Sequence, residues 1–274
     1  MNDALEAYLS GLSFSAQGRH EEALLSFERT LALDPENAGA WIGRGLALAY
    51  LGQYDPCVQA FDRAIALDEN DEITWYNRGI ALHILKHDDE ALLSFDRVLT
   101  INPSHSLAWA GKARSYAALE HYHKAIDAYD RSLGYGTDEA DSWTGKANVY
   151  FELHQYEDAL GSFEKALALD AANAHALNGK AAVLMELGRI DESIGTFEKV
   201  LSLDPDNVTA LTGRARGMIT RGQYGTALED LGHSIRIDGQ DSKSWYLRGV
   251  ALGMSGRRDE AFHAFGAPKS TRLN

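Results

Sequence analysis

The chain has 274 residues, of which 45% are hydrophobic and 24% are charged, and its formal net charge is −14. This composition excludes a disordered chain, because the apolar residues suffice for a continuous core. The acidic balance, with no run of Lys and Arg to offset it, argues against nucleic acid or an anionic membrane as the main partner.

Signals for targeting or membrane insertion are missing from the sequence. The first residues, MNDALEAYLSG, lack a basic start followed by an apolar stretch, so no signal peptide is expected. No segment has the apolar length that a membrane-spanning helix needs. The single cysteine, Cys57, excludes an internal disulfide. We therefore expect a soluble, cytoplasmic chain.

A period of 34 residues organises the chain. Trp41, Trp75, Trp109 and Trp143 follow one another at this step. A fixed period of this length is typical of a repeat architecture and predicts a single array across residues 1–274. The eight predicted repeats cover approximately residues 4–37, 38–71, 72–105, 106–139, 140–173, 174–207, 208–241 and 242–268.

Each repeat contains two predicted helices. In the first helix, repeat positions four, eight and eleven alternate large, small and large residues on one face, which allows a neighbouring helix to approach closely. In the second helix, a small residue is followed four positions later by an aromatic residue in most repeats, as in Ala23 and Phe27. Short turns such as residues 51–54 predict antiparallel pairs, and Asp34-Pro35 is a typical helix stop.

From about Ala4 to Ala267, these positions resemble the tetratricopeptide repeat family. The resemblance implies an all-α fold, a right-handed superhelical α-solenoid of antiparallel helix pairs whose first helices line the concave face. Two junctions depart from the family pattern, at Gly134-Tyr135-Gly136 and at Asp238-Gly239, and are expected to be looser or bent.

A second stripe on each first helix, at positions two, five, nine and twelve, faces the groove according to the resemblance. It is mainly apolar in repeats one to three and gains polar residues from repeat four onward. Asn side chains suit the backbone of an extended peptide, and Arg side chains suit acidic residues. We therefore predict a groove that binds a protein or peptide segment. The predicted partner-binding residues are Tyr8, Ile42, Tyr76, Ile80, Arg114, Asn148, Asn178, Arg216 and Tyr246.

Two alternatives remain open for these surfaces. The stripe is also compatible with an ordinary solvated helix face. In repeat eight, Phe262 and Phe265 precede Gly266-Ala267-Pro268, and no amphipathic helix follows to cover them. This end is predicted either to self-associate or to be covered by its own short tail. Some members of the family grip a chaperone carboxylate with Lys and Asn, but no three consecutive repeats here assemble that clamp.

Enzymatic, metal-binding and polyanion-binding functions are disfavoured. One cation per repeat recurs from Arg44 to Arg248, and we expect these cations to pair with acids that end the preceding helices, such as Asp34 and Asp68. His121-Tyr122-His123 lacks zinc-ligand spacing, and Cys57 occupies a small core position. The glycines that recur at the Gly43 position are expected to permit close helix contact. We predict no cofactor and no catalytic site.

Overall fold

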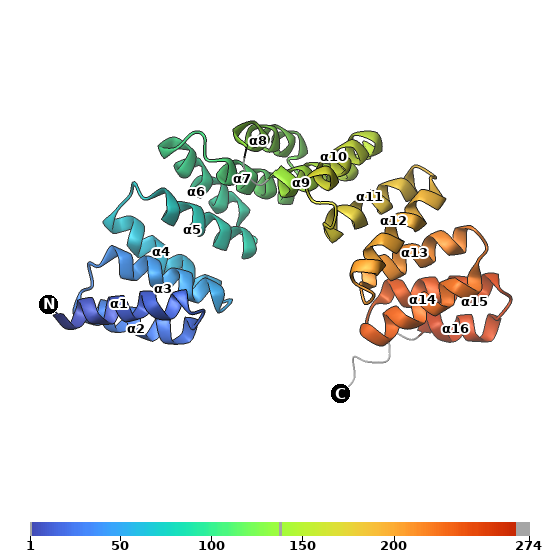
Figure 1. The fold of residues 1–274 in the computed structure, drawn as a ribbon, viewed down its shortest axis with the longest axis horizontal. Coiled ribbons are helices and arrows are strands. Elements are labelled where there is room, and N and C mark those ends of the chain that lie inside the picture. The colour runs from blue at the N-terminus through green and yellow to red at the C-terminus, as the bar shows by residue number, and fades with distance from the viewer. Residues whose placement is uncertain (1, 137–138, 267–274) are drawn as a thin grey trace. The chain divides into compact units, whose positions relative to one another are not determined.

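The computed structural model describes residues 2–136 and 139–266. Within these residues the chain forms sixteen helices in eight successive pairs and no strand (Figure 1), as predicted from the period. The helices are α1 Asn2–Ala16, α2 His20–Leu33, α3 Ala38–Tyr50, α4 Tyr54–Leu67, α5 Glu72–Ile84, α6 Asp88–Ile101, α7 Ser106–Ala118, α8 Tyr122–Tyr135, α9 Glu139–Glu152, α10 Tyr156–Leu169, α11 Ala174–Glu186, α12 Ile190–Leu203, α13 Val208–Thr220, α14 Tyr224–Ile237, α15 Ser242–Met254 and α16 Arg258–Gly266.

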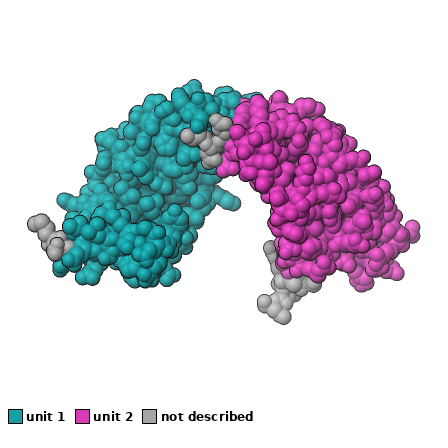
Figure 2. Space-filling view, viewed as in Figure 1, with its two compact units in different colours: residues 1–138 teal, residues 139–274 magenta. Residues whose placement is uncertain are grey.

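The chain divides into two compact halves, which Figure 2 distinguishes by colour. We call residues 1–138 the N-terminal half and residues 139–274 the C-terminal half. Each half contains four helix pairs among its described residues. The single continuous array across both halves stays a prediction.

First helices begin at polar residues that cap the helix amides. The side chain of Asn37 accepts a hydrogen bond from the amide of Ala40 at 2.9 Å, and Asn173 does the same for Ala176. Such caps satisfy amides that lack a partner inside the helix and typically contribute about 1 kcal/mol. The junction at Asp238-Gly239 keeps the cap and turn bonds of the Asp-Pro junctions, so the prediction that it is looser was wrong. The Gly134-Tyr135-Gly136 junction continues into residues 137–138, outside the described residues.

The turn inside each helix pair contains one residue with positive φ. At Gly52 φ is +72°, and the following amide donates to the carbonyl of Leu48 at 2.9 Å, which closes the helix end. Repeats three to five place other residues at this position, namely Lys86, Glu120 and His154, with φ of 62°, 59° and 57°. A side chain in this conformation costs about 1–2 kcal/mol. The three middle turns are therefore strained where the others are not.

The core repeats one packing unit, a phenyl ring of the second helix held between two first helices. A Cβ atom added at Gly11 would lie 2.7 Å from the ring of Phe27, and one added at Gly43, in the next repeat, would lie 2.4 Å from it. Gly111, Gly179 and Gly213 meet the rings of the preceding repeats in the same way. Close helix contact therefore accounts for Gly43, Gly111, Gly179 and Gly213, as predicted from their recurrence.

Within each half, the backbones of adjacent first helices approach each other closely, whereas the backbones of adjacent second helices lie farther apart among the described residues. In the N-terminal half the contacting pairs are α1 with α3, α3 with α5 and α5 with α7. In the C-terminal half they are α9 with α11, α11 with α13 and α13 with α15. In a stacked array of repeats, the layer of helices that lie closer together forms the concave side. We call the exposed side of the first helices the inner face of each half.

Candidate functional site

The inner face of the N-terminal half contains a pocket between α3 and α5. Its volume is about 290 Å³, which lies at the low end of the range for ligand pockets and suits one or two side chains. Position-nine residues Leu46 and Ile80 line it from the two helices, and Phe61 of α4 contributes a fully buried ring. The remaining lining residues are Ala49, Tyr50, Tyr54, Asn77, Ala81 and Ile84. The pocket is therefore mainly apolar.

Two features shape the rim of this pocket. The ring of Tyr50 stacks on the ring of His20 from repeat one, with centroids 4.3 Å apart and planes 6° from parallel. Asn77 donates a hydrogen bond from Nδ2 to the carbonyl of Ile73 at 2.8 Å. Its Oδ1 accepts no hydrogen bond within the described part of the chain. The rim thus offers one fixed aromatic ring and one acceptor oxygen.

Two of the predicted position-five residues, Tyr8 and Tyr76, pack within their own repeat and against the next one. Tyr8 and Tyr76 are half-buried, and their rings lie 6.0 and 6.1 Å from those of Phe27 and Phe95 in their own repeats. Both also reach the next repeat. The Tyr8 hydroxyl lies 2.6 Å from the position of a Cβ added at Gly39, and the Tyr76 ring stacks on His105 at 5.3 Å.

Ile42 occupies the same repeat position as these tyrosines and is likewise half-buried. Tyr246, in the last repeat, packs against Phe265 at 5.9 Å but is 60% exposed. Tyr8 and Tyr76 are covered in part by the repeat that follows them. No described repeat follows Tyr246, which accounts for its greater exposure.

Polar residues predicted in the C-terminal half contact each other. Arg216 donates to Oε1 of Glu186 at 3.0 Å, and this ion pair joins α13 to α11. Asn178 donates to Oδ1 of Asn207 at 3.3 Å, while its own Oδ1 is buried without a partner. These contacts occupy the Arg216 guanidinium and the Asn178 amide that were predicted to meet a peptide.

Asn148 follows this pattern, whereas Arg114, in the N-terminal half, does not. Asn148 lies 3.3 Å from Nε2 of His175, both on half-buried or exposed positions of the inner face. Arg114 is half-buried on α7, at the same repeat position as Leu46 and Ile80. No hydrogen bond or ion pair reaches Arg114 from residues 2–136 or 139–266. Of the two predicted arginines, only Arg114 keeps its guanidinium unpaired.

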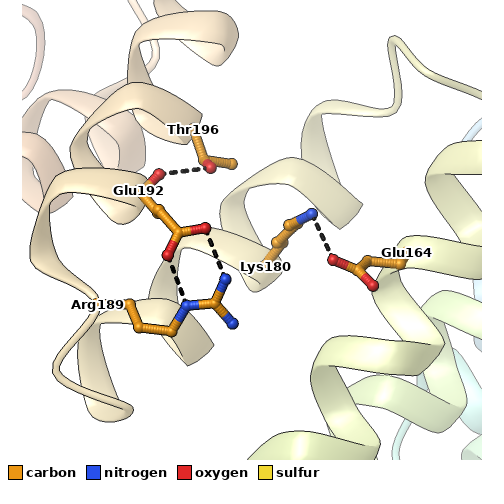
Figure 3. Close-up of polar contacts among 5 residues, drawn as sticks. All are labelled: Glu164, Lys180, Arg189, Glu192 and Thr196. Atoms are coloured by element: carbon orange, nitrogen blue, oxygen red, sulfur yellow. Dashed lines mark hydrogen bonds and ion pairs between the residues drawn. The ribbon is translucent and has the colours of Figure 1, made fainter.

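The recurring cations pair with acids, but not with the acids predicted from sequence. Arg78 contacts Asp62 at 2.7 Å and Lys180 contacts Glu164 at 2.8 Å, the latter visible in Figure 3. Arg44 pairs with Glu28, and Lys112 pairs with Asp96. These acids lie sixteen residues before each cation, in the middle of the preceding second helix rather than at its end. The expected pairs with terminal acids such as Asp34 were therefore wrong.

In repeat seven the acid follows the cation in sequence. Arg214 pairs with Asp230 of its own second helix through two hydrogen bonds of 2.8 and 2.6 Å. These bonds raise the pKa of Arg214. Figure 3 also shows Arg189, directly before α12, paired with Glu192 in the first turn of that helix. The closest nitrogen and oxygen atoms of this pair are 2.6 Å apart. These ion pairs neutralise much of the positive charge of the recurring cations, which had raised the possibility of polyanion binding.

The histidine and cysteine side chains do not form a catalytic arrangement among the described residues. His83 Nδ1 lies 2.6 Å from the carboxylate of the buried Asp88 and 3.4 Å from the hydroxyl of Ser115. Both contacts fall on the same ring nitrogen, whereas a nucleophile relay uses both nitrogens. Burial raises the pKa of the Cys57 thiol to about 12, so the reactive thiolate is disfavoured. No cluster of His, Cys, Asp and Glu suited to a metal ion occurs among the described residues.

Comparison with protein families matches residues 8–72 and 144–208, and separately residues 73–105, to tetratricopeptide repeats. These ranges cover more than half of the chain. No curated protein sequence matches it significantly.

Several solved structures share the fold at low sequence identity. A tetratricopeptide repeat protein from Parabacteroides merdae aligns with a TM-score of 0.75 and 16% identity, over 92% of this chain and 100% of that one. YrrB, described as a tetratricopeptide repeat protein with an unusual peptide-binding site, aligns with a TM-score of 0.54 and 24% identity over 68% and 96%. A chain of the Cut9–Hcn1 hetero-tetramer aligns with a TM-score of 0.67 and 16% identity, over 96% of this chain and 52% of that one.

Proposed function

Because the chain belongs to the tetratricopeptide repeat family, we propose that it is a non-enzymatic scaffold that binds a peptide or protein segment on the inner face of its N-terminal half. The family generally mediates protein interactions, which supports the general class of function. We also propose a cytoplasmic location for this scaffold. None of the described helices combines the length and apolar character needed to cross a bilayer.

The observation that carries the proposal is the pocket between α3 and α5. An apolar pocket with a few polar groups at its rim is the usual form of a binding site. Leu46 and Ile80 lie on adjacent first helices, so a segment that crosses these helices would meet both side chains. The inner face of the C-terminal half is less suited, because its polar side chains are engaged with one another.

Affinity capture from a lysate of the source cells tests the proposal. The native chain is compared with the variant Leu46→Ala/Ile80→Ala, which removes two apolar walls of the pocket. The control is Leu25→Ala/Leu93→Ala, because both leucines are exposed on second helices, away from the inner face. We expect a protein that the native chain and the control retain and the pocket variant loses. Equal capture by all three chains contradicts the proposal.

A second candidate function, self-association through repeat eight, is favoured by its exposed aromatic residues. Phe262 is 80% exposed and Phe265 48% exposed. The Phe265 ring packs against Gly249 of its own repeat, but no described glycine from a following repeat covers its other side. The N-terminal repeat of a second copy would place Leu9, not glycine, at that position. The packing therefore favours contact between two C-terminal ends over a head-to-tail chain.

The mass of the protein as a function of concentration tests this second candidate. Sedimentation equilibrium is expected to show a dimer for the native chain and for Leu25→Ser, and a monomer for Phe262→Ser. A native chain that remains monomeric at high concentration contradicts it. The predicted alternative, coverage by the chain's own tail, involves residues 267–274, which lie outside the described residues.

A further inference from the structure

We propose that the pocket between α3 and α5 accepts one apolar side chain of a peptide, and that Arg114 binds a carboxylate of the same peptide three or four residues away. This inference rests on the proposed function and names the chemistry of its ligand. It requires two anchor points on one inner face, both within the N-terminal half.

The apolar anchor follows from the lining of the pocket. Leu46, Ile80 and Ile84 surround a volume of about 290 Å³, enough for a Leu, Ile, Met or Phe side chain but small for a larger ligand. Burial of an aliphatic or aromatic side chain contributes about 1.5–3 kcal/mol in general. Asn77 is one of the lining residues, and its Oδ1 is free to accept a hydrogen bond from a peptide amide. A charged side chain would find no counter-ion among the lining residues.

The acidic anchor follows from the state of Arg114. Neighbouring cations on the first helices have acids beside them, as Arg78 has Asp62 and Lys112 has Asp96. Arg114 is half-buried and has no such partner among the described residues. A guanidinium fork binds a carboxylate through two parallel hydrogen bonds, and these are stronger in a partly desolvated site. Arg114 is therefore the cation on this face that is ready for an external acid.

The spacing between the anchors follows from the repeat. Ile80 and Arg114 occupy the same position on α5 and α7, which are in contact. Packed helices lie about 8–10 Å apart, and the pocket lies a further half-spacing away, between α3 and α5. An extended peptide advances about 3.3 Å per residue, so three or four residues cover the distance once the long Arg114 side chain is included.

The net charge of −14 restricts the peptide further. A highly acidic segment would be repelled by the chain as a whole. A peptide with one or two acids at a defined distance from an apolar residue gains the contact with Arg114 and avoids most of that repulsion. The net charge of the chain therefore favours peptides with an acid at the right distance from the apolar residue over peptides that are acidic throughout.

A random dodecapeptide library displayed on phage and selected on the full chain tests the inference. We expect enriched peptides that contain Leu, Ile, Met or Phe, with Asp or Glu three or four residues away. The best peptide is then synthesised with its acid intact and with that acid replaced by the amide. Binding of both peptides to the native chain, to Arg114→Gln and to Leu46→Ala/Ile80→Ala is measured by fluorescence anisotropy.

We expect the amide peptide to bind the native chain roughly 10-fold or more weakly, which is the usual scale for a hydrogen bond to a charged group. Arg114→Gln should reduce binding of the acidic peptide by a similar factor and leave binding of the amide peptide unchanged. Circular dichroism establishes that each variant remains folded.

The two proposals fail in different ways. Peptides that need Leu46 and Ile80 but bind Arg114→Gln as tightly as the native chain overturn the acidic anchor and leave the proposed function standing. Enriched peptides without an apolar residue overturn the apolar anchor. A selection in which no peptide is lost on Leu46→Ala/Ile80→Ala, or in which none is enriched, overturns both the inference and the proposed inner-face function.

Discussion

The inner faces of the two halves are built from the same repeat positions, yet their side chains have different partners. In the N-terminal half, Leu46 and Ile80 leave a pocket of about 290 Å³, and Arg114 has no partner among the described residues. In the C-terminal half, Arg216 is held by Glu186, and Asn178 is held by Asn207. Of the polar residues predicted on the two faces, Arg216 and Asn178 are therefore already bonded within the C-terminal half, whereas Arg114 is not.

This difference shows that polarity alone does not identify a binding face. A donor that is already bonded must break that bond before it contacts a ligand, so most of the gain is lost. An apolar pocket and an unpaired cation have no such competing interaction. Binding capacity follows the groups that the fold leaves without partners.

The largest expected effect tests whether the buried phenylalanine rings stabilise the two halves equally. Phe95→Ala in the N-terminal half and Phe163→Ala in the C-terminal half each empty a fully buried ring site. Each is expected to cost about 3–5 kcal/mol, the usual loss for a buried phenylalanine. Urea unfolding followed by circular dichroism measures the cost. The control Leu93→Ala, at an exposed position, should change stability by less than about 0.5 kcal/mol. A loss of less than about 1 kcal/mol of unfolding free energy for only one of the two variants would show that the core packing differs between the halves.

Glycine substitutions next to the buried rings give a second measure of core packing in the two halves. Gly111→Ala and Gly179→Ala place a methyl group about 2.6 and 2.2 Å from a buried ring in the N-terminal and C-terminal halves respectively. Overpacking of this kind typically costs about 1–3 kcal/mol. Gly161→Ala is the matched control, because it lies in a helix with nothing within 4 Å of the added atom. The control should gain about 0.5–1 kcal/mol. Equal effects at all three glycines in urea unfolding would contradict this packing.

The polar contacts of the C-terminal half make a smaller prediction. Arg216→Gln removes an exposed ion pair, and Asn178→Leu removes one hydrogen bond together with a buried oxygen that has no partner. Each should change the free energy of unfolding by less than about 1 kcal/mol. Neither should weaken binding of a selected peptide measured by anisotropy. If Arg216→Gln abolished binding while the chain stayed folded, the comparison between the halves would be reversed.

The smallest prediction concerns the turns. Glu120 has φ of 59° where Gly52 has 72°, so Glu120→Gly should stabilise the chain by about 1 kcal/mol and Gly52→Ala should destabilise it by a similar amount. Neither change touches the inner face, so peptide binding should stay constant. Thermal unfolding measures both. Destabilisation by Glu120→Gly would indicate that its side chain has an unrecognised stabilising role.

The fold was predictable because the residues that determine it recur. Tryptophan at the Trp41 position marks five of the eight first helices, and the small residue at Gly43 recurs where the ring of Phe27 must fit. Repetition averages out local ambiguity, so eight weak signals predict one architecture. The partners of the recurring cations were missed, although an acid sixteen residues before Arg44, Arg78 and Lys180 was a readable signal.

The candidate site was predicted less completely, and particular residues show why. Ile80 and Arg114 were placed on the groove stripe, but the pocket depends on how α3 and α5 pack, and periodicity does not give that distance. Asn178 and Arg216 were assigned to a ligand because sequence gives donor types and not their partners. Their partners, Asn207 and Glu186, lie about thirty residues away, on neighbouring helices.

The most direct test of the account compares one selected peptide with matched variants of the two inner faces. The N-terminal variant is Leu46→Ala/Ile80→Ala, and the C-terminal variant is Asn148→Ala/Arg216→Ala. The account predicts that the first variant loses binding by roughly 10-fold or more, because two apolar contacts are removed, while the second stays within about twofold of the native chain. Loss of binding in the C-terminal variant with unchanged binding in the N-terminal variant would contradict it.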